Sequence, residues 1–242
     1  MKKFYCYGVL LFTIASLLLY TTSTAQIKVG AVGGLAISKF TSLKHYHSDF
    51  VTSFSTSPYL SYYTGVYAKF PIQKKIQLQS CFVVTRKGSE TKSEVFSGFA
   101  SFDYRKIRLT YIQVPLNIMY SFYKEKNTNA FFGCGLYAGR SVYGFETGRG
   151  IGYNDLESYE IIDRINFTAH NPGQLLPTNI HRYDVGYNLL AGVTIHHVEI
   201  SGAFSRGFTN ALSNADLYGG NYKNTTLNIL FGYYITLNGR KS

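Results

Sequence analysis

Two carboxylates, Asp184 and Glu199, stand inside stretches of alternating polarity and are the first candidates for chemistry. A pair of acids can act as general acid and base, and Ser, His and Asp together can form a nucleophilic triad. The chain has no G-x-S-x-G, however, and no spacing singles out one set of Ser, His and Asp. Because buried strand carboxylates more often serve structure, we predict no catalytic residue.

Histidine pairs are the second candidates, for metal binding. His45 and His47 are two residues apart, and His196 and His197 are adjacent. A pair of histidines is weak evidence for a site that usually needs three or four protein ligands. We therefore predict neither a metal site nor a cofactor, and we expect that the protein is not an enzyme.

Charged residues on the small, polar side of the strands are expected to be structural. They are Lys28, Lys69, Asp184 and Glu199. Buried charges must be paired or hydrogen-bonded. We expect Glu199 to neutralise Lys28 or Lys69 near one end of the fold, and Asp184 to meet a basic residue near the other.

Basic residues gather where the strands are expected to end. These are Lys39, Arg86, Lys87, Arg105, Lys106, Arg108, Arg140, Arg182, Arg206 and Lys223. At a membrane surface such a collar would pair with lipopolysaccharide phosphates. The alternative is that strand ends simply leave the hydrocarbon, where charge is permitted. Despite the net charge of +11, cations in a ring do not form a nucleic-acid groove, so we expect no nucleic-acid partner.

The elements that position these residues are stretches of period-two alternation, the pattern of β-strands. In "RLTYIQVPLNIMYSF" the apolar residues Ile112, Val114, Leu116 and Ile118 alternate with small or polar ones. The expected strands are 27–40, 59–70, 76–88, 105–123, 130–143, 182–195, 198–209 and 224–237. Their apolar faces are oily, while the opposite faces carry Gly, Asn, Ser, Gln and Thr with few charges.

This pattern favours an inside-out barrel, in which lipid bathes the oily face and a small polar interior takes the amides and glycines. The connections also alternate in length. Short ones lie at 71–75, 124–129 and 196–197, and long ones at 41–58, 89–104, 144–181 and 210–223. We predict an all-β fold: an eight-stranded antiparallel up-and-down transmembrane β-barrel with short periplasmic turns and long extracellular loops. An exported soluble β-sandwich is the alternative.

Aromatic residues near the strand ends are expected to form the interfacial girdles of such a barrel. They are Phe40, Tyr59, Phe70, Phe122, Tyr143 and Tyr183. The inward Tyr63, Tyr67, Tyr137, Met119 and Leu190 are expected to fill the narrow lumen. Bulk solute conduction is therefore not expected.

The N-terminus has the three parts of a secretory signal peptide: MKK, the apolar run "FYCYGVLLFTIASLLLY", and a small-residue site at Ser23–Ala25. Cleavage after Ala25 divides the chain into a signal peptide, 1–25, and a barrel domain, 26–242. The composition agrees, with 22 Tyr, 18 Phe and 23 Gly but only 15% charged residues. We predict export to the cell outer membrane, with its lipid and lipopolysaccharide as partners.

Several segments resemble the PorT family of outer-membrane β-barrels, common in the Bacteroidetes. They are "GAVGGLAISKF", "YYTGVYAKFPIQKKIQLQSCFVVTRKGS", "LTYIQVPLNIMYSF", "FFGCGLYAGRSVYG" and "YDVGYNLLAGVTI". The run Tyr111–Leu116 is similar to that family's Y-I-x-I/V-P-L strand. The resemblance implies a barrel in the outer membrane and a link to type IX secretion or gliding, although most members have no assigned activity.

These observations lead to two expected functions. The first is a non-enzymatic accessory or assembly factor of the cell envelope, linked to type IX secretion or gliding. The alternative is a surface binding protein or adhesin that contacts protein partners through the extracellular loops 41–58 and 144–181. An outer-membrane enzyme is the least favoured reading.

Overall fold

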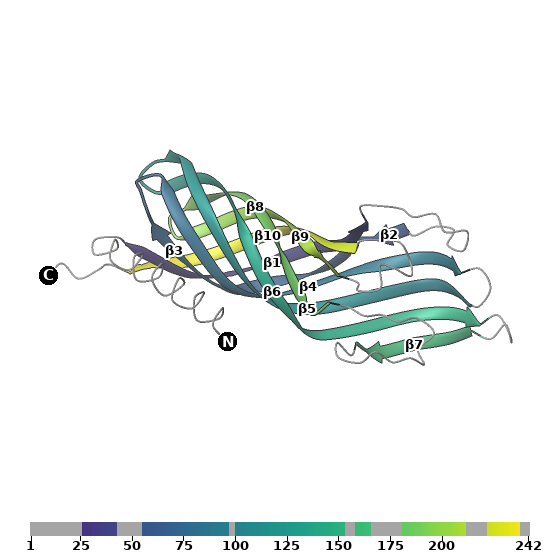
Figure 1. Ribbon diagram of the computed structural model, residues 1–242. Helices are drawn as coiled ribbons and strands as arrows, with labels where there is room; N and C mark the ends of the chain where they lie inside the picture. Colours follow the sequence, from purple (N-terminus) through teal and green to yellow (C-terminus); the bar gives the residue numbers. More distant parts are fainter. Residues whose placement is uncertain are drawn as a thin grey trace, which may run out of the picture.

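The computed structural model describes residues 26–42, 55–96, 100–152, 158–165, 181–211 and 222–237. Within these ranges, ten strands form one sheet (Figure 1). They are β1 (Ile27–Ser42), β2 (Ser55–Ser57), β3 (Tyr59–Pro71), β4 (Ile76–Phe96), β5 (Ala100–Lys124), β6 (Thr128–Gly152), β7 (Ser158–Arg164), β8 (Tyr183–Ile195), β9 (Val198–Asn210) and β10 (Tyr222–Leu237). The predicted signal peptide, 1–25, lies outside the described residues.

Eight of these strands close into a barrel, and β2 and β7 are short additions to it. The order around the barrel is β4-β3-β1-β10-β9-β8-β6-β5, and β5 pairs with β4 to complete the circle. Every pairing is antiparallel, including that of the first strand, β1, with the last, β10, which runs from Ile27 opposite Leu237 to Ser42 opposite Tyr222. The predicted eight-stranded up-and-down barrel is confirmed. Closure matters because an open strand edge leaves N–H and C=O groups unpaired.

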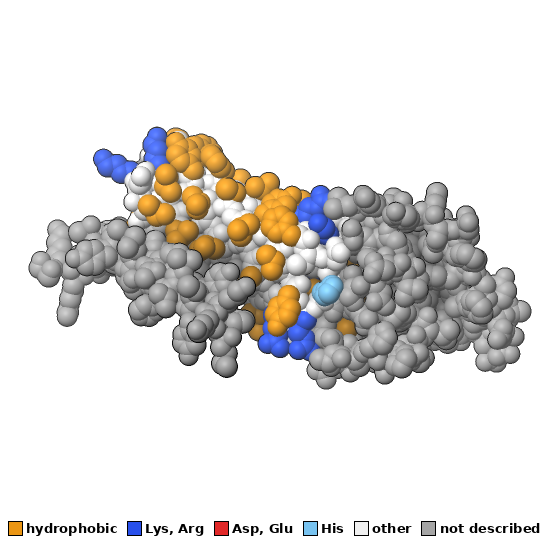
Figure 2. Space-filling view, in the orientation of Figure 1, with side chains coloured by type: hydrophobic (Ala, Val, Ile, Leu, Met, Phe, Trp, Pro, Cys, Tyr) orange, Lys and Arg blue, Asp and Glu red, His pale blue; other side chains and the backbone are white. Residues whose placement is uncertain are grey.

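The side chains alternate between the two faces as the sequence predicts. On β5, Leu116 and Ile118 are 50% and 56% exposed, whereas the intervening Asn117 is 5% exposed. Figure 2 shows the outward hydrophobic side chains as a band over the barrel, with Lys and Arg at both ends of the band. The barrel is therefore oily outside and polar inside. In the described part of the chain, no helix is long and apolar enough to cross a membrane.

Pro115 marks a gap in one hydrogen-bonded ladder. Proline has no N–H to donate, so it interrupts pairing on one side of a strand. The β4–β5 pairing stops between Ser80–Leu116 and Val83–Gln113 and resumes in the same register. On its other side, Pro115 still pairs with Tyr137 of β6. The strand thus passes the proline without a bulge toward β4.

The two ends of the barrel differ. At the short-turn end, the links are 72–75, 125–127 and 196–197, and His196 takes φ 55° in its two-residue turn. At the opposite, long-loop end, β4, β5 and β6 continue past the barrel, and β7 pairs with β6 there (Figure 1). The prediction that 89–104 is a long connection between strands is wrong, because β4 runs to Phe96 and β5 starts at Ala100.

We call the distal parts of β4, β5 and β6, together with β7, the projecting sheet. Beyond the membrane both faces of a strand can meet water, so no alternation of oily and polar residues is needed there. The polar stretch 89–104 consequently carried no period-two signal, although its residues 89–96 and 100–104 belong to paired antiparallel strands.

Candidate functional site

The long-loop end of the barrel interior is organised around Asp184, near the start of β8. The Lys87 ammonium of β4 lies 2.8 Å from Asp184 Oδ2, and these side chains are 2% and 1% exposed. The carboxylate also accepts hydrogen bonds from the Tyr137 hydroxyl at 3.2 Å, Asn224 Nδ2 at 3.1 Å and the Thr209 hydroxyl at 3.4 Å. This Asp184 cluster joins five of the eight barrel strands.

Two glycines make room for this arrangement. A Cβ at Gly186 would lie 2.7 Å from ring atoms of Tyr137, and one at Gly207 would lie 2.7 Å from Asp184 Oδ1. Any larger residue would push the tyrosine or the carboxylate out of place. The glycine-rich interior face of β8 and β9 therefore sets the position of the buried charge.

Lys87 corrects the predicted collar. It was expected at the membrane surface beside Arg86, but its side chain lies inside the barrel. Adjacent residues of a strand point to opposite faces, so only one of the two can face outward, and that is Arg86. The alternation of inward Val83 and outward Phe82 already contained this information.

The short-turn end of the interior holds the second buried pair. Lys69 of β3 pairs with Glu199 of β9, and the side chains are 5% and 6% exposed. The sequence left Lys28 and Lys69 as alternative partners, and the structure selects Lys69. Lys28, opposite Lys69 in the β1–β3 ladder, donates to the Tyr234 hydroxyl at 3.3 Å. We call Lys28, Lys69 and Glu199 the Glu199 cluster.

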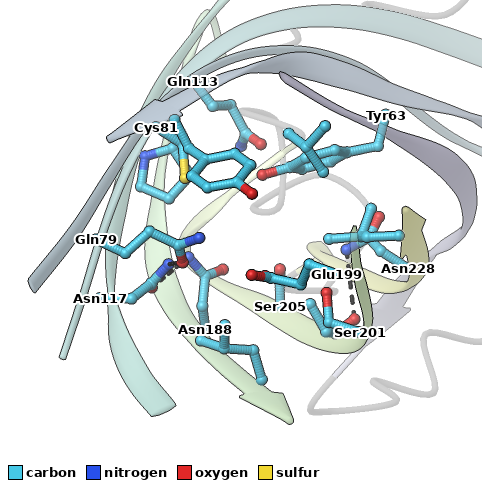
Figure 3. A pocket seen from close by; sticks show the side chains of 16 residues that line it. Tyr63, Gln79, Cys81, Gln113, Asn117, Asn188, Glu199, Ser201, Ser205 and Asn228 are labelled. Carbon is cyan, nitrogen blue, oxygen red and sulfur yellow. Dashed lines mark hydrogen bonds between the residues drawn. The ribbon is translucent and has the colours of Figure 1, made fainter. Parts of the chain in front are cut away.

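Between the two clusters lies a small cavity of about 40 Å³, lined by both polar and apolar side chains, with room for a few water molecules. Amide side chains surround it (Figure 3). Asn117 donates to Gln79 at 3.3 Å and accepts from Asn188 at 3.4 Å. The inward Tyr67, Tyr137 and Met119 are buried around this lumen as expected.

A hydrophobic cluster closes the long-loop end above the Asp184 cluster. It consists of Phe40, Ile107, Leu109, Tyr111, Ile165 and Ala211. Phe40 was predicted to lie in an interfacial girdle, and this is wrong, since its ring is 3% exposed. The reason is again the strand period: Lys39 faces outward, so Phe40 faces inward. Of the other predicted girdle residues, Phe122, Tyr143 and Tyr183 are exposed, and Tyr59 and Phe70 are partly buried.

The remaining cations of the predicted collar that lie on strands and have described side chains are on the outward face, whereas Arg182 precedes β8 and is in phase with the inward Asp184. Lys39 and Arg140 are exposed, and Arg86, Lys106, Arg108, Arg182, Arg206 and Lys223 are partly buried. Arg105 lies on β5, but its side chain is outside the described residues. Some of these cations are engaged within the protein: Lys106 pairs with Glu90, and Arg108 contacts Thr147 and the Phe145 ring.

The interior carboxylates do not meet as a catalytic pair would. Asp184 lies at the long-loop end, whereas Glu199 follows the turn at 196–197 at the other end, and each is paired with a lysine. Among the described residues, no group of three or more His, Cys, Asp or Glu is placed to hold a metal ion. His45 and His47 lie outside the described residues, as does most of the 41–58 and 144–181 loops.

A closed eight-stranded barrel, oily outside and polar inside, defines a barrel of the outer-membrane class. A family model described as outer membrane protein beta-barrel domain matches residues 22–213. The chain belongs to this family, and it is an outer-membrane protein. A comparison with curated proteins finds no match.

Several solved structures are similar in fold. The attachment invasion locus protein Ail of Yersinia pestis, in complex with the heparin analogue sucrose octasulfate, is 11% identical, with 87% of this chain and 99% of that chain covered and a TM-score of 0.39. OprG from Pseudomonas aeruginosa is 12% identical, with 88% and 97% covered and a TM-score of 0.40. Neisserial surface protein A is 13% identical, with 86% and 96% covered and a TM-score of 0.38.

Proposed function

We propose that this protein is a non-enzymatic envelope factor that contacts a protein partner through its projecting sheet. The observation that carries the proposal is the continuation of β4, β5 and β6 past the barrel, with β7 paired to β6 over Phe145–Ile151. A sheet that extends well beyond its barrel presents backbone and side chains to a partner outside the bilayer. Segments positioned by a rigid scaffold are where binding residues concentrate.

The interior supports a scaffold role over a conducting role. Both ends of the lumen hold a buried ion pair, and the long-loop end is further closed by the cluster of Phe40, Ile107, Leu109 and Tyr111. An eight-stranded barrel leaves space only for its own side chains. The wall of the barrel then serves as a rigid anchor for the sheet outside it.

The resemblance to the PorT family, seen best in the strand with Tyr111–Leu116, suggests the process in which the protein takes part. We propose an accessory or assembly role in type IX secretion or gliding. The alternative is a surface binding protein or adhesin. One observation favours it: the loops 41–58 and 144–181 contribute β2 and β7, and these strands pair with β4 and β6, respectively.

Shortening the projecting sheet tests both readings. Residues 153–180, which include β7, are replaced by a short Gly/Ser linker. The control variant replaces 212–221, at the same end of the barrel but in the β9–β10 connection, by a linker of the same composition. Folding of both variants is checked by heat-modifiable migration in gel electrophoresis.

We expect the first variant to fold and insert but to lose function, while the control retains it. Loss of secreted cargo supports the envelope machinery, whereas intact secretion with lost surface binding supports the adhesin. If both variants keep normal secretion and normal surface binding, the projecting sheet is not the working surface and the proposal fails.

A further inference from the structure

Three of the outward cations lie together on neighbouring strands. Arg206 of β9 is opposite Thr225 of β10, and Thr225 is opposite Lys39 of β1. Lys223 is two residues from Thr225 on β10 and pairs with Thr41 of β1. We call these five residues the rim site. Neighbouring strands are about 4.8 Å apart, so Arg206 and Lys39 are separated by about 10 Å and their long side chains can reach a common ligand.

The rim site also holds two hydroxyls between its cations. Thr41 Oγ1 and Thr225 Oγ1 are 2.8 Å apart and hydrogen-bonded. Both threonines are on the outward face, in phase with Lys39 and Lys223. Ammonium, guanidinium and hydroxyl donors on one face are the groups that bind phosphate oxygens.

The row beneath the rim site is oily. Ile37 is opposite Leu227, and Leu227 is opposite Phe204. These three residues lie one outward position below Lys39, Thr225 and Arg206, respectively. Arg206 also stands between Phe204 and Phe208, whose rings lie 6.2 Å and 5.7 Å from the ring of Tyr187. On β1 and β10 the boundary between the apolar band and the cations therefore falls between two adjacent rows, whereas on β9 the exposed Phe208 continues the apolar face beyond Arg206.

The charges of the rim site have no acidic partner in the part of the chain that the structure describes. Within the described ranges, no carboxylate forms an ion pair with Lys39, Arg206 or Lys223, whereas Lys87 and Lys106 each have an acidic partner. Arg140 is likewise exposed, but it lies on β6, which β8 separates from β9. The residue opposite it on β8 is Tyr183, not a second cation. Three cations without a carboxylate partner among the described residues, at the edge of an apolar band, suit an anionic, membrane-bound ligand.

We propose that the rim site binds the phosphate of a phosphorylated glycolipid of the lipopolysaccharide type. The phosphate lies among Lys39, Arg206 and Lys223, and the acyl chains lie on the row of Ile37, Leu227 and Phe204. This narrows the predicted collar of ten cations to one side of the barrel. It is independent of the role of the projecting sheet.

The test is the affinity of detergent-solubilised, full-length protein for bisphosphorylated lipid A, measured by native mass spectrometry. The test variant is Lys39→Gln/Arg206→Gln/Lys223→Gln. The control variant is Lys74→Gln/Lys75→Gln/Arg140→Gln, which removes two lysines and one arginine from exposed positions elsewhere. Dephosphorylated lipid A is the comparison ligand.

We expect the test variant to bind lipid A about tenfold more weakly or worse, with the control within about twofold of the wild type. Dephosphorylated lipid A should bind the wild type as weakly as it binds the test variant. Arg206→Lys keeps the charge but loses the planar guanidinium, so it should give a partial loss even if the triple variant folds poorly. Equal losses in test and control variants, no loss in either, or phosphate-independent binding would each overturn the proposal.

Discussion

Each of the two buried ion pairs described in the barrel joins a lysine to a carboxylate, but their surroundings differ. At the long-loop end, the Asp184 carboxylate accepts hydrogen bonds from Lys87 and from three further donors on different strands. At the short-turn end, the one hydrogen bond described for the Glu199 side chain comes from Lys69, and Lys28 adds a second positive charge nearby. One cluster is balanced and densely bonded, and the other has two cations for one carboxylate.

This difference shows how a narrow barrel keeps charge in its interior. Desolvating a carboxylate is costly unless other groups satisfy its lone pairs. The Asp184 cluster meets this requirement with hydrogen bonds. In the Glu199 cluster, Lys69 is the one donor described for the carboxylate. Ring contacts do not distinguish the clusters: the Lys69 ammonium lies 5.2 Å from the Tyr67 ring centroid and 5.0 Å from that of Phe131, and the Lys87 ammonium lies 4.4 Å from that of Tyr137 and 5.5 Å from that of Tyr111. Such contacts stabilise a cation partly removed from water.

The largest expected effect is that of Asp184→Ala. The substitution leaves the Lys87 ammonium buried without a counter-charge and removes the acceptor of three other donors. We expect the free energy of unfolding to fall by about 3–5 kcal/mol. Because the chain contains no tryptophan, urea unfolding in lipid vesicles is best followed by far-UV circular dichroism.

The matched control for this variant removes both charges, as Lys87→Met/Asp184→Leu. Replacing a buried ion pair by apolar residues is often nearly neutral, so the double variant should be more stable than Asp184→Ala alone. A loss below about 1 kcal/mol for Asp184→Ala would contradict the assignment of Asp184 as the centre of its cluster.

The sequence was enough to predict which face of the barrel wall most side chains take. It was not enough to predict which lysine pairs with each buried carboxylate. Leu116 and Asn117 could be assigned to opposite faces because lipid on one side imposes a period of two. The same rule places Arg86 and Lys39 outward and Lys87 and Phe40 inward. The predictions for Lys87 and Phe40 were wrong because they considered only how close each residue is to the strand end, and not whether it is an odd or even position in the alternation. The stagger between strands, which brings Lys69 and not Lys28 to Glu199, cannot be predicted from the pattern of any single strand.

The projecting sheet was missed for a different physical reason. Its strands leave the membrane, so residues 89–104 lose the oily face that made the rest of the barrel visible in the sequence. The rim site was also only partly predictable. Its cations could be placed near strand ends, but Lys39 and Arg206 are brought to either side of Thr225 by the pairing of β10 with β1 and with β9.

A smaller effect is expected for Glu199→Ala. It leaves Lys69 without its carboxylate, but Lys69 is the one described donor that loses its acceptor, whereas Asp184→Ala removes the acceptor of four donors. We expect a loss of about 2–3 kcal/mol, less than that of Asp184→Ala. The same urea titration measures it. A loss for Glu199→Ala equal to or greater than that for Asp184→Ala would show that the number of hydrogen bonds does not distinguish the two clusters.

The finest distinction comes from two tyrosine hydroxyls, one near each cluster. Tyr137 donates its hydroxyl to Asp184, whereas the buried Tyr67 hydroxyl has no hydrogen-bond partner among the described residues. Tyr137→Phe should therefore lose about 1–2 kcal/mol, since a hydrogen bond to a charged group disappears, and Tyr67→Phe should change stability by less than about 0.5 kcal/mol. Both substitutions keep the ring, so packing is conserved and the difference between them isolates the hydroxyl. Equal effects would mean that Asp184 does not depend on its tyrosine donor, and that the Asp184 cluster is held by Lys87, Asn224 and Thr209.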